Sequence, residues 1–309
     1  MNEFTTITDG LAFPEGPVLM PDGVIVLGEI GAGRLTRISM DGQKSVIAET
    51  GGGPNGLALG ADGMLYVCNN GGFSWDRTGG QWRPVGKAPD NAGGSIQRVD
   101  PHTGKVFILY TCCGDVPLSA PNDIVFDRHG GFYFTDHGHR QGRKVDFGAV
   151  YYAKADGSHI CEVAYPLLGP NGIGLSPDHS VLYVAETSSG RLWSWRIEEP
   201  GKLAKADWPS PTGGDLAAGL ACFQRYDSLA VEENGNIAIA TLRFGGVVVV
   251  SPAGEEIERI RTPDPYTTNL CFGGADRRTA FITLSGSGRL VRMPWARPGL
   301  ALASIVSEG

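Results

Sequence analysis

Six polar residues with oxygen-bearing side chains recur along the 309-residue chain, each at the start of a similar apolar segment. They are Glu15, Asn55, Asn122, Asn171, Asp227 and Asn269. Carboxylates and amide carbonyls are hard oxygen donors, which Ca²⁺ prefers and which Mg²⁺ or Mn²⁺ can share. Two carboxylates would balance the charge of one divalent cation, and without a cation they would repel each other. If the fold gathers these residues, they predict a divalent-cation site that could hold a water for hydrolysis.

Each of these residues can also be interpreted as a turn residue at the entry to a strand. Asn and Asp hydrogen-bond their own backbone, and flanking Pro and Gly fix the bend, as in Pro-Asn-Gly at 170–172. Glu15 is poor at such bonds, and turn chemistry does not require two acids and four amides at equivalent positions. For one repeat the turn interpretation stays open, whereas the whole set favours a shared site.

Six copies of one repeat carry these residues. The repeat cores cover residues 13–29, 54–70, 121–136, 170–187, 226–241 and 268–285. Each core has an alternating apolar strand, a turn such as Pro-Asp-Gly, and a second apolar strand. A third strand usually follows, and a fourth is visible before some of the next cores, at 45–50, 105–111 and 255–262. Four strands repeated six times predict an all-β six-bladed propeller, because stacked blades bury faces that a single sheet would expose.

The two ends of the chain are expected to meet. Residues 4–8, Phe-Thr-Thr-Ile-Thr, precede the first core in the position of a fourth strand, whereas little chain follows the last third strand. We predict that this N-terminal strand completes the sixth blade, and that residues 1–309 form one propeller domain with four antiparallel strands in each blade. The six polar side chains, being in the same phase of the innermost strands, would then form a ring at the axis.

Composition argues against several partners. The net charge of −7 and the pI of about 5.4 come without any basic stripe, so we expect no nucleic-acid partner. The first residues lack the pattern of a secretion signal, and no apolar run is long enough for a membrane helix, so we expect a cytoplasmic protein with no membrane partner. The six cysteines include no Cys-x-x-Cys pair and are expected to be buried, reduced thiols.

Two long insertions are expected at the mouth of the ring. Residues 71–94 carry Phe73, Trp75 and Trp82, and such an aromatic loop either covers a ligand or packs as an edge cover. Residues 201–226 carry Trp208, which we expect to pack at a blade edge.

Two histidines, His137 and His139, follow the second strand of the third repeat and should reach the same mouth. A metal pair is disfavoured, because no third soft ligand is evident. A hydrogen bond to a substrate carbonyl, proton transfer, and a plain loop position remain the alternatives.

Several motifs occur in a characteristic order. They are Phe-Pro-Glu-Gly-Pro at 13–17, Pro-Asn-Asp at 121–123 with Phe-Thr-Asp at 134–136, Pro-Asn-Gly-Ile at 170–173, and Asp-Ser-Leu-Ala-Val at 227–231. In these motifs the chain resembles the regucalcin/gluconolactonase family of six-bladed propellers over essentially its full length. The resemblance implies that Glu15, Asn171 and Asp227 bind a metal directly and that Asp227 is the base or nucleophile. It implies for Asn122 a contact to metal or to substrate.

Two positions depart from the family pattern. Ala120 stands where gluconolactonases of this type have an arginine that grips the sugar acid, and His137 replaces the proline after Phe-Thr-Asp. We therefore expect a substrate that is bulkier or less polar than a simple sugar lactone.

The leading hypothesis is a metal-dependent lactonase that opens a cyclic ester of a small-molecule substrate. Ca²⁺ is the expected ion, with Mg²⁺, Mn²⁺ and Zn²⁺ as alternatives; Asp227 would accept a proton from water, and the metal and Asn122 would stabilise the oxyanion. His137, Trp75 and Asn55 are expected to contact the substrate. The alternatives are a calcium-dependent phosphotriesterase-like hydrolase and a non-catalytic ligand-binding propeller with a structural metal.

Overall fold

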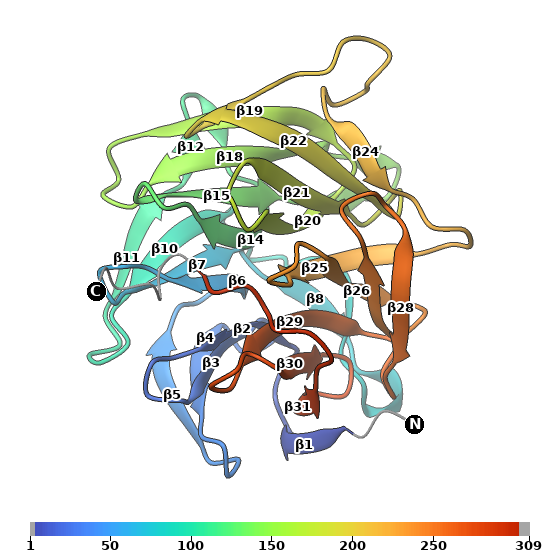
Figure 1. Cartoon of the computed structure of the whole chain (residues 1–309). Helices are drawn as coiled ribbons and strands as arrows, with labels where there is room; N and C mark the ends of the chain where they lie inside the picture. The colour runs from blue at the N-terminus through green and yellow to red at the C-terminus, as the bar shows by residue number, and fades with distance from the viewer. Residues whose placement is uncertain (1–3, 303–309) are drawn as a thin grey trace.

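Six antiparallel sheets are arranged radially about one axis in the computed structural model, which describes residues 4–302 (Figure 1). Five sheets each arise from one sequence repeat, the sixth combines the last repeat with the N-terminal strand, and the first strand of every repeat lies innermost. The predicted all-β six-bladed propeller is confirmed.

The first three blades follow the chain from the axis outward. Blade 1 consists of β2 (Pro14–Leu19), β3 (Ile25–Glu29), β4 (Arg34–Ile38) and β5 (Lys44–Glu49). Blade 2 consists of β6 (Pro54–Leu59), β7 (Leu65–Asn69), β10 (Ser95–Val99) and β11 (Val106–Tyr110). Blade 3 consists of β14 (Pro121–Phe126), β15 (Gly131–Asp136), β18 (Gly148–Lys154) and β19 (Ile160–Leu167).

The last three blades repeat this order with two variations. Blade 4 consists of β20 (Pro170–Leu175), β21 (Val181–Glu186), β22 (Arg191–Glu199) and β24 (Asp215–Ala218), with β23 (Lys202–Leu203) also paired to β22. Blade 5 consists of β25 (Arg225–Val231), β26 (Ile237–Leu242), β27 (Gly246–Val250) and β28 (Glu256–Arg261). Blade 6 consists of β29 (Thr267–Gly273), β30 (Thr279–Leu284), β31 (Arg289–Pro294) and β1 (Thr5–Thr8).

The N-terminal strand closes the ring, as the repeats predict. In blade 6, β1 runs antiparallel to β31, with Thr5 opposite Arg292 and Thr6 opposite Val291 (Figure 1). The first and last parts of the described chain therefore share one sheet, which fixes blade 6 against blade 1.

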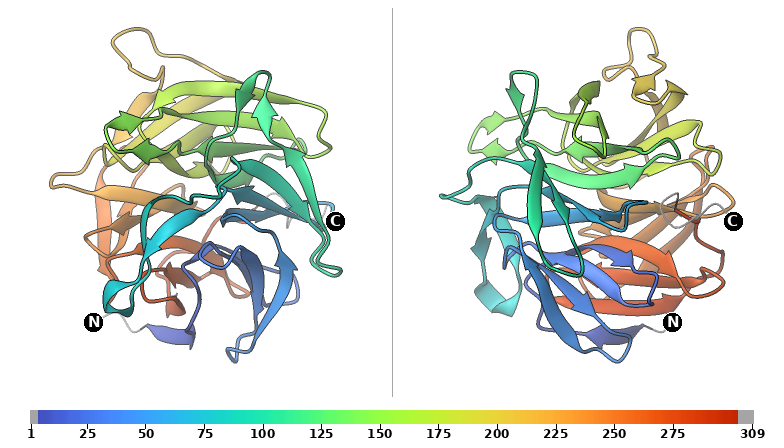
Figure 2. Two further views of the ribbon diagram at one scale, coloured as in Figure 1. Left: turned by 180° about the vertical axis from the view of Figure 1, so that it is seen from behind. Right: turned by 90° about the vertical axis from the view of Figure 1, so that its left-hand side faces the viewer.

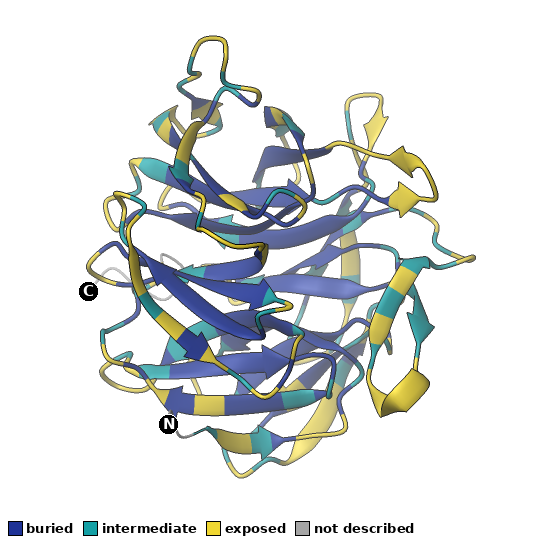
Figure 3. Cartoon of the chain, turned by 90° about the vertical axis from the view of Figure 1, so that its right-hand side faces the viewer, coloured by how far each residue is buried: buried dark blue, intermediate teal, exposed yellow. Residues whose placement is uncertain are grey.

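Three small hairpins form separate two-stranded sheets outside the blades. They are β8 (Phe73–Asp76) with β9 (Arg83–Lys87) and the 3₁₀ turn η1 (Thr78–Gly80), β12 (Cys112–Cys113) with β13 (Val116–Pro117), and β16 (Arg140–Gln141) with β17 (Lys144–Val145). Figure 3 shows that buried residues are concentrated in the inner blade strands, whereas hairpins, loops and outer strands carry most of the exposed and intermediate residues. Within residues 4–302, no helix has the length and apolar character needed to cross a bilayer.

Apolar side chains between neighbouring blades form the core. Between blades 2 and 3, for example, Tyr66 and Phe126 pack with ring centroids 4.9 Å apart, and Phe126 lies 5.3 Å from Phe132. Burying one such side chain contributes roughly 1.5–3 kcal/mol. These interfaces hold the inner strands in place and so position their polar first residues.

Two sequence-based expectations are wrong. The segment 201–226 supplies β24, the outer strand of blade 4, and Trp208 is 92% exposed instead of packing at a blade edge. The reason is that the connection between β23 and β24 projects away from the blade (Figure 2). All six cysteines are free, but only Cys68 is buried; Cys113, Cys161 and Cys271 are half-buried and Cys112 and Cys222 are exposed, so the expectation of buried thiols holds in full for Cys68 alone.

Candidate active site

The inner strands bring the six recurring polar residues to one end of the ring. Each inner strand contacts the inner strand of the next blade, and β29 contacts β2, so the inner ring is closed. The six side chains belong to residues that are only 2% to 8% exposed: Glu15, Asn55, Asn122, Asn171, Asp227 and Asn269. We refer to these six residues as the hub.

Glycines next to the hub residues allow the inner strands to approach closely. A Cβ added at Gly16 would lie 2.4 Å from the carbonyl oxygen of Asn55, and one at Gly56 would lie 2.5 Å from that of Asn122. Neither position has room for a side chain, and Gly16 also has a φ of 55°, in the left-handed region. The Glu-Gly and Asn-Gly pairs thus bring neighbouring hub residues together.

The two hub carboxylates lie close enough to affect each other. Glu15 Oε2 accepts hydrogen bonds from the Gly16 N–H (2.8 Å) and from Asn269 Nδ2 (2.9 Å). Burial raises the pKa of Glu15, although these hydrogen bonds oppose the rise. Burial also raises the pKa of Asp227 well above its usual range; the negative charge of Glu15 adds to this rise, and a hydrogen bond with Asn171 opposes it. Both carboxyl groups are therefore costly to ionise together unless a cation lies beside them.

Two hub amides present oxygens that no donor reaches. The Oδ1 atoms of Asn122 and Asn171 are buried and have no hydrogen-bond partner. Leaving a buried acceptor unsatisfied costs about 1–3 kcal/mol, and a bound cation would remove this cost. In the described part of the chain no three His, Cys, Asp or Glu side chains form a metal-binding group, so a cation here would need these amides. Two carboxylates with two free amide oxygens form a donor set that fits a hard divalent cation.

A third buried carboxyl group, that of Asp123, lies beside the hub and was not among the sequence-based candidates. Burial, aided by the negative charge of Glu15, raises its pKa to about 7, and a hydrogen bond with Ser228 opposes the rise. In a regular strand Asp123 would face away from Asn122. However, β14 loses its regular register between Pro121 and Ile124, and the alternation fails there.

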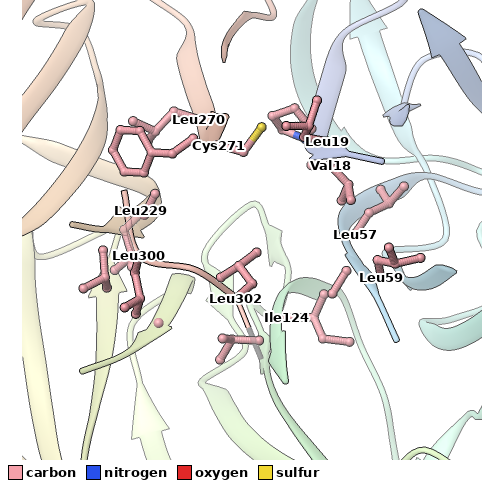
Figure 4. Close-up of a pocket in the computed structure, with 18 of the residues that line it drawn as sticks. Val18, Leu19, Leu57, Leu59, Ile124, Leu229, Leu270, Cys271, Leu300 and Leu302 are labelled. Carbon is pink, nitrogen blue, oxygen red and sulfur yellow. The ribbon is translucent and has the colours of Figure 1, made fainter. Parts of the chain in front are cut away.

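Beyond the hub, the axis of the ring contains an apolar cavity of about 440 Å³. Its wall includes Val18, Leu57, Ile124, Leu229 and Leu270, with Leu300 and Leu302 from the C-terminal segment (Figure 4). Asp123 also lines this cavity. The apolar surroundings on this side contribute to the desolvation of the Asp123 carboxyl group.

The insertion at 71–94, which we call the aromatic hairpin, contacts three blades besides its own. The ring centroids of Trp75 and Phe13 of blade 1 are 5.0 Å apart, and those of Phe73 and His139 of blade 3 are 6.3 Å apart. The backbone N–H of Trp82 donates a hydrogen bond to the backbone carbonyl of Gly286 in blade 6 at 2.8 Å. Phe73 and Trp75 also line a cavity of about 450 Å³ between the hairpin and blades 1 and 2. The hairpin thus packs its aromatic rings, as one sequence-based alternative predicts, and it also borders a cavity.

The two loop histidines are placed near the same face. His137 is half-buried, and its Nδ1 lies 3.1 Å from the Gly138 carbonyl oxygen. Burial lowers the pKa of His137, and the positive charge of Arg225 also lowers it. His139 is buried, its Nε2 has no partner, and burial lowers its pKa too. Both imidazoles are therefore neutral at pH 7.

Comparison with known proteins places this arrangement in a family. Residues 13–286 match the model of the SMP-30/Gluconolactonase/LRE-like region. Among curated relatives, the lactonase drp35 of Staphylococcus haemolyticus is 27% identical over 252 residues, which cover 81% of this chain and 69% of the relative. The lactonase drp35 of Staphylococcus aureus (strain bovine RF122 / ET3-1) is 29% identical over 210 residues, covering 68% of this chain and 57% of the relative.

Solved structures share the fold. A gluconolactonase from Xanthomonas campestris, described as important in glucose secondary metabolic pathways, superposes with a TM-score of 0.75 at 24% identity, covering 95% of this chain and 89% of that one. Regucalcin, a calcium-binding protein from Agrobacterium tumefaciens, superposes with a TM-score of 0.72 at 17% identity, covering 96% and 99%. The chain is thus similar to propellers of this type over nearly its whole length.

Proposed function

The chain belongs to the SMP-30/gluconolactonase/LRE-like family, and from this premise we propose that it is a cation-dependent lactonase. The observation that carries the cation requirement is the hub itself: two mutually repelling buried carboxyl groups beside two buried amide oxygens without donors. The curated relatives named as lactonases support the choice of a cyclic ester as substrate.

In this proposal Glu15, Asn122, Asn171 and Asp227 hold one divalent cation, for which Ca²⁺ is the best match to an oxygen-only donor set. When bound, the cation would supply Lewis-acid polarisation of the lactone carbonyl. Removal of the Asp227 proton is the first requirement, because only the carboxylate can accept a proton from the attacking water. The amide Nδ2 of Asn122 is suited to donate a hydrogen bond to the developing oxyanion.

The surroundings of the hub favour a substrate with an apolar part. Ala120 is buried and offers no cation to a sugar acid, whereas Phe73 and Trp75 border a cavity at the face where the inner strands begin. We propose that Trp75 and Asn55 contact the substrate and that neutral His137 hydrogen-bonds it. Neutral imidazole can donate or accept a hydrogen bond without adding charge.

A lactone panel assayed with and without chelator tests the proposal. We expect lactone hydrolysis that a chelator abolishes and that Ca²⁺ restores. A fluorophosphate in the same assay separates the phosphotriesterase alternative, which predicts the faster rate on the phosphorus substrate. If no ester or phosphoester is turned over while the chelator still lowers the melting temperature, the metal is structural and the lactonase proposal is wrong.

Substitution of Trp75 tests the role of the aromatic hairpin. We expect Trp75→Ala to raise KM by about tenfold for a lactone with an apolar substituent, with a smaller change in kcat, because loss of an aromatic contact weakens binding by roughly 1–1.5 kcal/mol. Trp208→Ala is the matched control, since Trp208 is almost fully exposed and far from the hairpin in sequence. An unchanged KM in Trp75→Ala, measured by steady-state kinetics, would show that the hairpin only packs.

A further inference from the structure

A second candidate site lies at the end of blade 5, outside the hub. An open cavity of about 590 Å³ there is bordered by three arginines, two phenylalanines and a glutamine. We call it the arginine groove and define it by Phe223, Gln224, Arg243, Phe244, Arg259 and Arg261. In a chain with a net charge of −7, three guanidinium groups around one cavity form a local concentration of positive charge.

Aromatic rings hold the three guanidinium groups in position. The Cζ atom of Arg243 lies 5.1 Å from the ring centroid of Phe223. Those of Arg259 and Arg261 lie 5.2 and 4.6 Å from the ring centroid of Phe244. Arg259 and Arg261 are two residues apart in β28 and therefore share one face of the strand. Arg259 uses its N–H donors on Glu256 and on the Cys222 sulfur, whereas those of Arg243 and Arg261 make no side-chain hydrogen bond within residues 4–302 and can bind an anion.

Acidic partners neutralise only part of this charge. Arg259 pairs with Glu256, with Nε 3.0 Å from Oε1. Among the ion pairs of residues 4–302 none involves Arg243 or Arg261. The groove therefore has two guanidinium groups whose charge no carboxylate within residues 4–302 neutralises at ion-pair distance, and this positive charge favours an anion.

The backbone around the groove is strained at two points. Cys222, which also borders the cavity, has a φ of 70°, and Arg243 has a φ of 68°. Non-glycine residues in this region are uncommon and concentrate at binding and active sites. The buried Gln224 holds Cys222 in place by donating from Nε2 to Sγ at 3.2 Å, and its Oε1 accepts a hydrogen bond from Thr241 at 2.7 Å. Two of the groove's loops are thus kept in conformations that a free chain would avoid.

We propose that the arginine groove binds the phosphate group of a small organic phosphate. A phosphate dianion offers more acceptor oxygens and more charge than a carboxylate, and guanidinium groups on two separate elements can bind it from different sides. Phe223 is 58% exposed and offers an apolar surface to the organic part of the ligand. None of the six hub residues lines this groove.

Calorimetric titration with phenyl phosphate at an ionic strength of about 0.01 M tests the proposal, since weak screening favours detection. We expect saturable binding at one site in the whole protein. The double variant Arg243→Gln/Arg261→Gln should weaken it by at least about tenfold, because both uncompensated guanidinium groups are lost. Arg292→Gln, which changes an exposed arginine of blade 6, should bind as the unmodified protein does.

Two comparisons make the assignment specific. Benzoate, which carries a carboxylate on the same ring, should bind at least about tenfold more weakly than phenyl phosphate. Glu15→Gln should bind phenyl phosphate normally. Equal affinities for the two probes would overturn the phosphate assignment. Loss of binding in Glu15→Gln with retention in the arginine double variant would place the ligand at the hub and overturn the proposal altogether.

Discussion

Replacement of Asp227 by asparagine is expected to lower lactone turnover by about 10²- to 10⁴-fold at saturating Ca²⁺. An amide cannot take a proton from water, although it keeps the size of the side chain and an oxygen that can bind a cation. The buried position of Asp227 beside Glu15 means that no bulk-water base can substitute for it. The measurement is kcat on the best lactone of the panel, with the Ca²⁺ concentration raised until the rate no longer changes.

Asp123→Asn is the matched control for this substitution. Asp123 is also a buried carboxyl group with a raised pKa, and it lies on a neighbouring part of the inner ring. We expect its replacement to change kcat by less than about tenfold, because it is not the proposed base. Should Asp123→Asn lose as much activity as Asp227→Asn, or should Asp227→Asn retain its activity, the assignment of the base to Asp227 is wrong.

The propeller could be predicted from the sequence because the sequence pattern of one blade occurs six times along the chain. Six copies of one strand-turn-strand pattern reinforce one another, so a weak signal in any single copy matters little. Ring closure followed from the position of residues 4–8 relative to the first core, and β1 pairs with β31 accordingly. Strands outside the repeat pattern were harder to predict from the sequence. For example, β24 lies within an insertion whose sequence resembles a loop, and only its pairing with β22 identifies it as a blade strand.

The hub was predictable in its members but not in its detailed geometry. The strand register is interrupted beside the hub residue in each inner strand, as between Glu15 and Val18 in β2 or Tyr226 and Leu229 in β25. Such bulges re-aim side chains and break the two-residue alternation on which sequence reasoning depends. Asp123 was therefore missed although it follows Asn122 directly.

The clustering of arginines in the arginine groove could not be predicted from the sequence either. Arg243 comes from the connection between β26 and β27, whereas Arg259 and Arg261 come from β28. Neighbouring strands bring these positions together in space, and no motif spans the intervening residues. A pattern of this kind emerges only from tertiary structure.

The hub carboxyl groups should make the cation-free protein less stable as the pH rises from about 5 to about 8, whereas His137 and His139, whose pKa values burial lowers, act in the opposite direction below about pH 7. Burial raises the folded-state pKa values of Glu15 and Asp227, and the negative charge of Glu15 adds to the rise for Asp227, so these groups bind more protons in the folded protein than in the unfolded chain in this range. The stability contribution of such a group is present below its unfolded pKa of about 4 and is lost as the pH rises through the folded value. The stability contribution of Asp123, whose pKa is raised to about 7, falls with rising pH in the same way.

Ca²⁺ should therefore raise the melting temperature more at pH 8 than at pH 5, because at pH 5 protons already neutralise the hub and compete with the cation. A ligand at one hundred times its Kd stabilises the folded state by about 2.7 kcal/mol. For a chain of 309 residues that corresponds to a rise of roughly 4 °C. Differential scanning calorimetry with chelator and with excess Ca²⁺ at both pH values measures the effect.

Glu15→Gln should lose most of this response and, without Ca²⁺, should be more stable than the unmodified protein at pH 8, because one of the two repelling charges is gone. Glu255→Gln changes an exposed glutamate and should respond to Ca²⁺ as the unmodified protein does. A Ca²⁺ response that survives in Glu15→Gln, or one that is larger at pH 5 than at pH 8, would mean that the cation binds elsewhere. In that case something other than a cation would have to offset the cost of burying Glu15 and Asp227 together. The proposed role of the hub in activating water would then lose its physical basis.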